Sequence, residues 1–268
     1  MTNDVALGQM PNAPLALVLA QVRFSPYLTI GNSIPAIQDA LRKNYPLFRK
    51  SQIQSLEITG AGAPNISSVD RWDFVDQDNR EGFIVQQDSL TFLATRYKTF
   101  EDFAEKQYVV LSCFENTVKD VFVERLGLRY VDVIVPRGGE QPEQYVVDGL
   151  RGCSLEMYSP LQFRSQYVGR WNLDSGAMTL RFINGAPKPY LPPDLQPLEL
   201  GIPEIIEKAS TASGRVGTLD FDRALEHRGL YSASKISELF AGMHADASNV
   251  FKRAMSPLAK EVWNSKIG

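Results

Sequence analysis

The sequence predicts an α+β fold with largely antiparallel sheets, helices packed on one face and two subdomains. Three observations lead to this prediction: strands with apolar side chains on both faces, short alternating strands joined by turns, and amphipathic helices between them. The other elements are arranged around residues 124–136, where a strand ending at Pro136 carries Arg129 and Asp132 on opposite faces. Such a charge in a central strand requires a partner or a ligand.

The N-terminal subdomain is expected to span residues 1–138. Apolar periodicity assigns its elements, and Ser33 and Thr99 are expected to cap its helices. A loop is expected at 60–68. The elements are, in order, a strand at 15–24, a helix from 34 to 45, a strand at 52–59, strands at 71–75, 82–86 and 90–97, a helix from 100 to 118 and the strand at 126–135.

The C-terminal subdomain is expected to span residues 139–268. Polar residues with Gly and Pro at 137–148 mark the boundary between the two subdomains. A long amphipathic helix follows Ser232 or Ser234, and Ser256 caps a short final helix. The remaining elements are strands at 154–159, 162–173, 178–183 and 218–222, and a proline-rich extended arm at 184–203.

The composition indicates an ordinary globular protein. Of 268 residues, 44% are hydrophobic and 22% charged, with 28 Lys and Arg against 31 Asp and Glu. This balance gives no bulk basic charge that would indicate nucleic-acid binding. The sequence contains no apolar stretch long enough for a membrane span and no secretory signal, so a cytoplasmic protein without a membrane partner is expected. Cys113 and Cys153 are expected to be free thiols.

The motifs of common enzyme classes are absent from the sequence. It has neither the serine motif of the nucleophile elbow nor the phosphate-binding glycine loop, and Gly60 and Gly62 lack the third glycine of a dinucleotide site. The histidines, His227 and His244, stand alone, without paired metal-ligand spacing. We therefore predict no catalytic residue, no cofactor and no metal site, and we expect His244 to serve packing.

Five acidic residues between positions 70 and 81 form the densest acidic cluster. A divalent cation could bind there, which would make the protein a metal-dependent hydrolase. A solvated hairpin turn explains the turn residues of the cluster equally well, because Asp favours turns. The residues are Asp70, Asp73, Asp76, Asp78 and Glu81.

Arginines beside aromatic residues recur in the predicted strands. Aromatic side chains with arginine between them can hold bases and phosphates. Alternatively, the arginine stems cover apolar edges and the guanidinium groups pair with Asp and Glu. The candidate ligand-binding residues are Arg23, Arg125, Arg129, Arg164 and Arg170; Arg71, Arg96 and Arg181 show the same pattern.

Several motifs resemble a sporadically distributed family of bacterial proteins of unknown function and similar length. The Arg-Leu-Gly-Leu-Arg-Tyr run at 125–130 is the most specific of them, and His244 before Phe251 is the next. The resemblance spans nearly the whole chain, although Ser256-Pro257 departs from the threonine typical of the family. It implies no activity, and the patchy distribution suggests mobile or defence-linked genes. The remaining motifs are Ala13-Pro14-Leu15, Gln21-Val22-Arg23-Phe24, and Tyr97 with Phe100 and Phe103.

The first functional interpretation is a non-enzymatic protein-interaction module that assembles with itself or with another protein. The lack of catalytic motifs, the amphipathic C-terminal helix and the proline-rich arm favour it. Met243, His244 and Phe251 on that helix are the expected partner contacts. The alternative is a nucleic-acid or nucleotide-binding protein that uses an arginine-aromatic sheet face.

Overall fold

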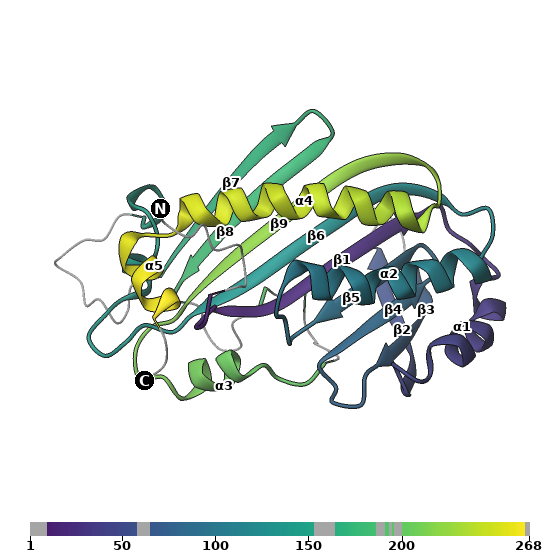
Figure 1. Cartoon of the computed structure of the whole chain (residues 1–268), viewed down its shortest axis with the longest axis horizontal. Coiled ribbons are helices and arrows are strands. Elements are labelled where there is room, and N and C mark those ends of the chain that lie inside the picture. The colour runs from purple at the N-terminus through teal and green to yellow at the C-terminus, as the bar shows by residue number, and fades with distance from the viewer. Residues whose placement is uncertain are drawn as a thin grey trace.

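The computed structural model describes residues 10–57, 65–152, 164–185, 191–192, 195 and 200–265. It confirms the α+β class, because the described strands form a nine-stranded antiparallel sheet with helices packed on it (Figure 1). The strands are β1 (Leu15–Phe24), β2 (Leu47–Glu57), β3 (Asn65–Val75), β4 (Glu81–Gln86), β5 (Ser89–Ala94), β6 (Phe122–Ile134), β7 (Ser165–Leu173), β8 (Gly176–Asn184) and β9 (Gly217–Leu230). The α-helices are α1 (Ile34–Leu41), α2 (Phe100–Thr117), α3 (Glu204–Thr211), α4 (Ala233–Ala254) and α5 (Pro257–Asn264).

The sheet joins the two halves of the chain. Its strand order is β2-β3-β4-β5-β1-β6-β9-β8-β7, so the N-terminal strand β1 lies in the middle. The strands of residues 139–268 join those of residues 1–138 where β9 pairs with β6, with Tyr130 opposite Phe221. The expected boundary between subdomains follows β6, and the strands on its two sides belong to one sheet.

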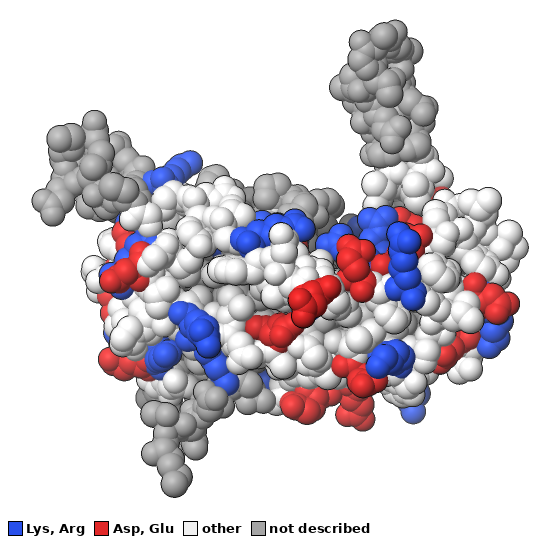
Figure 2. Space-filling view, turned by 90° about the horizontal axis from the view of Figure 1, so that it is seen from above, with Lys and Arg blue, Asp and Glu red and all other residues white. Residues whose placement is uncertain are grey.

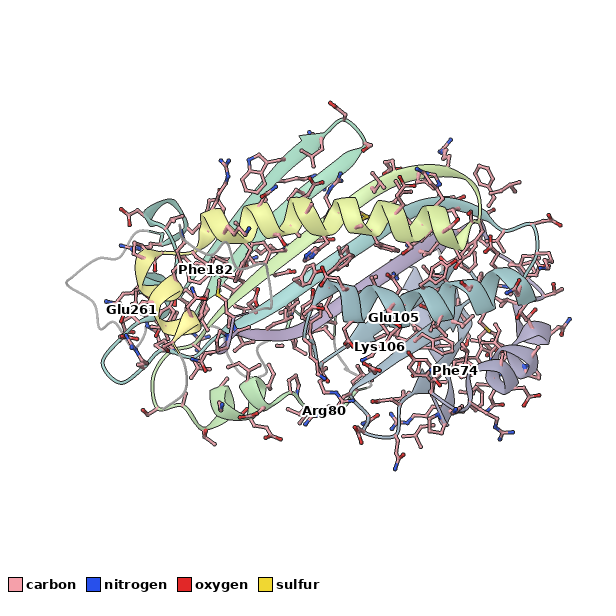
Figure 3. All side chains as sticks on the ribbon, viewed as in Figure 1. Phe74, Arg80, Glu105, Lys106, Phe182 and Glu261 are labelled. Carbon is pink, nitrogen blue, oxygen red and sulfur yellow. The ribbon has the colours of Figure 1, made fainter. Side chains whose placement is uncertain are left out.

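One face of the sheet, called here the helix face, carries α1, α2, α4 and α5. The core between these helices and the strands is rich in aromatic residues and runs from Phe74 on β3 to Phe182 on β8, which lie toward opposite ends of the sheet (Figure 3). Side chains alternate along each strand, so even-numbered residues of β6 such as Leu128 and Tyr130 enter this core. Burial of this face supplies most of the apolar stabilisation of the fold.

The opposite face, called here the back face, has a smaller core. There α3 packs on Leu17, Val131 and Val133, which come from β1 and β6. The sequence did not predict α3, because its residues directly follow the proline-rich stretch. Among the described residues, no helix is both long enough and apolar enough to cross a membrane.

The predicted helix caps are largely confirmed. The hydroxyl groups of Thr99, Ser232 and Ser256 accept hydrogen bonds from backbone N–H groups in the first turns of α2, α4 and α5. The prediction for Ser33 was wrong, because its side chain makes no capping hydrogen bond. A short 3₁₀ helix, Ile30–Ser33, leads directly into α1 instead.

Some strand limits differ from those predicted. β2 begins at Leu47, ahead of the expected start at Gln52, and β3 occupies part of the expected loop at 60–68. β9 continues to Leu230, because pairing with β6 supports charged residues that lack an apolar pattern. The strand expected at 154–159 and most of the proline-rich arm lie outside the described residues.

Candidate functional site

Arg129 lies on the back face and has the partner that its position requires. Its Nε donates to Oδ1 of Asp220 on β9 at 2.7 Å, and its second guanidinium nitrogen donates to Oδ2 at 2.8 Å. Arg181 on β8 donates to the same Oδ2 atom at 2.9 Å. The Asp220 side chain is fully buried, so the two cations compensate the desolvation of its charge.

The five candidate ligand-binding arginines occupy different environments. Strand alternation puts Arg23, Arg125 and Arg129 on the back face, and Arg170 on β7 points to the same side through its register with Thr179. Arg164 is exposed just before β7. Arg23 donates to Asp88 at 2.5 Å at the surface. Arg125 is exposed and forms no ion pair with any described residue.

The arginines and the aromatic residues do not share a face. Most of these arginines are followed directly by an aromatic residue, although Arg125 and Arg164 are not, and the alternation of a strand sends two such neighbours to opposite sides. The aromatic rings enter the helix face, and the guanidinium groups lie on the back face, where all but that of Arg170 have acidic partners among the described residues. The pairs are Arg23-Phe24, Arg71-Trp72, Arg129-Tyr130, Arg170-Trp171 and Arg181-Phe182. The strand period alone would have revealed this separation.

A polar groove of about 790 Å³ crosses the back face. We call it the arginine groove, because its described lining has four arginines and a single carboxylate, Asp222. Burial raises the pKa of Asp222 above its ordinary value. No aromatic residue is among the described lining residues. The groove is defined by Gln21, Arg23, Arg71, Arg125, Gly127 and Arg129.

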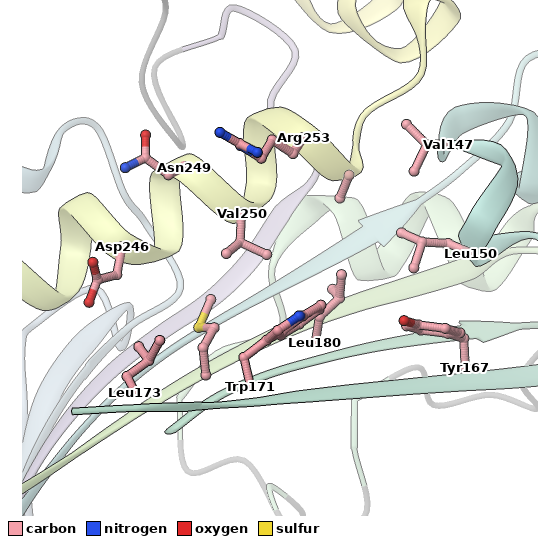
Figure 4. A pocket seen from close by; sticks show the side chains of 12 residues that line it. Val147, Leu150, Tyr167, Trp171, Leu173, Leu180, Asp246, Asn249, Val250 and Arg253 are labelled. Carbon is pink, nitrogen blue, oxygen red and sulfur yellow. The ribbon is translucent and has the colours of Figure 1, made fainter. Parts of the chain in front are cut away.

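A second groove, of about 620 Å³, lies between α4 and the β7–β8 hairpin. We call it the apolar groove. Its floor is formed by strand residues whose side chains point toward α4, and Asp246, Asn249 and Arg253 line its helical side (Figure 4). Sequence reasoning missed this groove, because the hairpin and α4 are distant in the chain. It is defined by Leu150, Tyr167, Trp171, Leu180, Val250 and Arg253.

The three expected partner contacts lie on the inner side of α4. Met243 and Phe251 are buried in the core of the helix face, at 2% and 1% exposure. A partner would reach them only if α4 left the sheet, so these two residues serve packing in the folded chain. The apolar stripe that suggested a docking helix is the stripe that holds α4 on the strands.

His244 also has a structural role. Its ring stacks on Phe100 of α2, with 4.1 Å between ring centroids and 2° between planes. The Tyr130 hydroxyl lies 2.8 Å from Nδ1, and the Ser248 hydroxyl lies 3.4 Å from Nε2. Burial lowers the pKa of His244 to about 4, so the ring is neutral at physiological pH. The histidine thus ties α2, α4 and β6 together, as expected from a packing residue.

The carboxylates of the acidic cluster all have partners, and Arg96 contacts both Asp76 and Asp78. Asp76 accepts hydrogen bonds from the backbone N–H groups of Arg80 and Glu81, which is the geometry of a turn. The described residues contain no group of three or more His, Cys, Asp or Glu side chains arranged to hold a metal ion. The other pairs are Asp70 with Lys50, Asp73 with Arg71, Asp78 with Arg96 and Glu81 with Lys106.

The surface charge is mixed. In the view from above, blue and red side chains lie interspersed on a mostly white surface (Figure 2). This agrees with the near balance of 28 basic and 31 acidic residues. Cys113 is a free thiol, and burial raises its pKa, which makes it a poor nucleophile. Cys153 lies outside the described residues.

A scan against protein-family models finds no match to this chain, and a search of curated proteins finds none either. The family resemblance of the strand motif at 125–130 therefore stays a prediction.

Proposed function

We propose that the protein is a non-enzymatic, self-assembling module in which β7 pairs with β7 of a second copy. The observation that carries this proposal is the exposure of apolar side chains on that strand. Val168, Trp171 and Leu173 are 54%, 44% and 40% exposed. Exposed apolar side chains on both faces of a strand at the edge of a sheet are typical of surfaces that another chain covers.

The position of β7 supports strand pairing. The strand is nine residues long and lacks proline, and β8 is its sole neighbour among the described strands. Its outer backbone N–H and C=O groups can therefore form a second antiparallel ladder. The other edge strand, β2, carries the consecutive cations Arg49 and Lys50. Cationic residues on an edge disfavour pairing, so β7 is the better candidate of the two edges.

The sequence of β7 is complementary to itself about Gly169. A two-fold axis at Gly169 sets Tyr167 of one copy opposite Trp171 of the other on the helix face. On the back face it sets Val168 opposite Arg170, so no like charges meet. Both rings already lean over the glycine: an added Cβ would lie 2.9 Å from the Tyr167 hydroxyl oxygen and from a Trp171 ring carbon. Tyr167 and Trp171 both line the apolar groove, so their pairing between two copies would join the apolar grooves of the two copies.

Two charge variants at Val168 test the pairing. Sedimentation equilibrium of the full chain should give a dimer that dissociates on dilution. Val168→Lys sets like charges opposite Arg170 at two symmetric positions and should weaken the dimer, whereas Val168→Glu sets opposite charges there and should preserve or strengthen it. Because Val168 is exposed, circular dichroism should be the same for both variants.

Two outcomes contradict the proposal. A wild-type chain that is monomeric at all concentrations has no such interface. A dimer that responds equally to Val168→Lys and Val168→Glu does not form by pairing Val168 with Arg170.

A further inference from the structure

The arginine groove contains a built arrangement of groups that the proposed self-assembly does not use. Arg23 on β1 and Arg125 on β6 are directly opposite in the strand register. Side chains in such a pair start only about 5 Å apart, and like charges there oppose each other. Asp88 pairs with Arg23 at the outer side, whereas Arg125 forms no ion pair among the described residues, although Glu226 of β9 lies opposite it in the register. An anion held between the two guanidinium groups would offset the repulsion that remains and give Arg125 a partner.

The floor of the groove beside these arginines is open. Gly127 lies two residues from Arg125 on the same face of β6, and a Cβ placed on it would meet no atom within 4 Å. Gly127 pairs with Gln21, whose amide nitrogen donates to the Thr91 hydroxyl at 3.1 Å. That bond fixes the Gln21 amide so that its oxygen can accept a hydrogen bond from a ligand.

We propose that the arginine groove binds a small phosphate-bearing molecule, with the phosphate between Arg23 and Arg125 and the rest of the molecule over Gly127 beside Gln21. Guanidinium forks match phosphate oxygens in geometry and charge. The volume of about 790 Å³ suits a ligand of nucleotide size. The lack of aromatic rings in the described lining argues against stacked bases of a nucleic-acid strand. Arg129, paired with Asp220, has a structural role here.

Calorimetric titration of the full chain in phosphate-free buffer tests the proposal. The probes are inorganic phosphate, ribose 5-phosphate, adenosine monophosphate and, as a probe without phosphate, ribose. At least one phosphate probe should bind saturably, and ribose should not. Arg125→Ala should weaken that binding about tenfold or more, because it removes a charged hydrogen-bond donor. This side chain is exposed, so the variant should fold.

A steric variant separates binding from folding. Gly127→Leu places a side chain in the open space of the groove and suits a strand, so the variant should fold and lose binding. Gly242→Leu is the matched control, because Gly242 on α4 also has open space beyond it and lies outside the groove. It should fold and bind as the wild type does.

The proposal is overturned if no phosphate probe binds, if ribose binds as well as ribose 5-phosphate, or if a folded Arg125→Ala or Gly127→Leu variant binds at wild-type strength. A single-stranded oligonucleotide that binds while all three phosphate probes fail also overturns it, in favour of a polymer ligand. None of these outcomes depends on whether the chain is a dimer.

Discussion

Asp132 and Asp220 lie on the neighbouring strands β6 and β9 and are equally buried, at 1% and 0% exposure. They nevertheless differ in their hydrogen-bond partners, because they point to opposite faces of the sheet. On the back face Asp220 receives hydrogen bonds from Arg129 and Arg181. Asp132 belongs by alternation to the helix face, and its Oδ2 has no hydrogen-bond partner among the described residues. Burial and the nearby charge of Asp220 raise the pKa of Asp132 to about 8.

The difference is set by the immediate neighbours of each carboxyl group. On the helix face Arg223 forms an ion pair with Asp246, but Oδ2 of Asp132 has no donor among the described residues, so burial keeps that carboxyl group neutral. The back face is lined with guanidinium groups, so it holds a carboxylate as an ion. Residues adjacent in a strand therefore lie in different environments. In an Arg-aromatic motif the arginine belongs to one surface of the sheet and the aromatic residue to the other.

The largest expected effect is the pH dependence of the free energy of unfolding that Asp132 causes. The folded pKa of about 8 lies above the ordinary 3.8, so between these values the folded chain holds a proton that the unfolded chain has lost. This contribution to stability is greatest below about pH 4 and declines toward pH 8, by at most about 1.4 kcal/mol per pH unit. Urea unfolding at a series of pH values should show that the free energy of unfolding of Asp132→Asn increases relative to that of the wild type as the pH rises.

A constant stability difference between the wild type and Asp132→Asn from acid to alkaline pH would show that the carboxyl group ionises normally. The statement that Asp132 on the helix face is neutral would then be wrong.

The next largest effect concerns the back face. Asp220→Ala leaves two guanidinium groups without their shared acceptor and should lower the free energy of unfolding by about 3–5 kcal/mol. Asp88→Ala, which removes the partner of a half-exposed Arg23, is the matched control and should cost about 1 kcal/mol or less. Denaturant unfolding measures both. Similar losses for the two variants would mean that burial does not distinguish these ion pairs.

The smallest effect compares a glycine in the helical layer with one in the sheet. Gly242 in α4 has open space around it, so Gly242→Ala should raise the free energy of unfolding by about 0.5–1 kcal/mol. Gly82 on β4 is different, because a Cβ there would lie 2.3 Å from the Phe74 carbonyl oxygen. Gly82→Ala should therefore destabilise the fold, and thermal unfolding should shift in opposite directions for the two variants.

Local patterns predicted local structure well. Hydroxyl caps at Thr99, Ser232 and Ser256 and the three-and-four spacing of α2 and α4 depend on neighbours within a few residues. The limits of β9 were missed, because its second half, with Arg223, Glu226, His227 and Arg228, becomes a strand by pairing with β6 and, as far as Leu225, with β8. Strand order and both grooves depend on segments distant in sequence, which a local pattern does not encode.

The candidate site was predicted in part. A charged residue at 129 required a partner, but nothing local identified Asp220 as that partner. The location of Arg23 and Arg125 on one face was within reach of sequence reasoning, because both follow from alternation. Their direct opposition required the pairing of β1 with β6. For Met243 and Phe251 the sequence pattern was ambiguous. An apolar stripe on a helix looks the same in the sequence whether it packs inside the chain or against another protein.

The central place of β1 has a consequence for biosynthesis. Of the strands that the structure describes, β1 is translated first, yet its two neighbours, β5 and β6, are translated much later. Until β5 and then β6 have emerged, the nascent chain holds an apolar strand without its two neighbours, which is the kind of segment that chaperones protect. In this protein the first described strand is therefore synthesised well before it can pair. Slowing translation between β1 and β6 should lengthen the time during which the nascent chain is prone to aggregate.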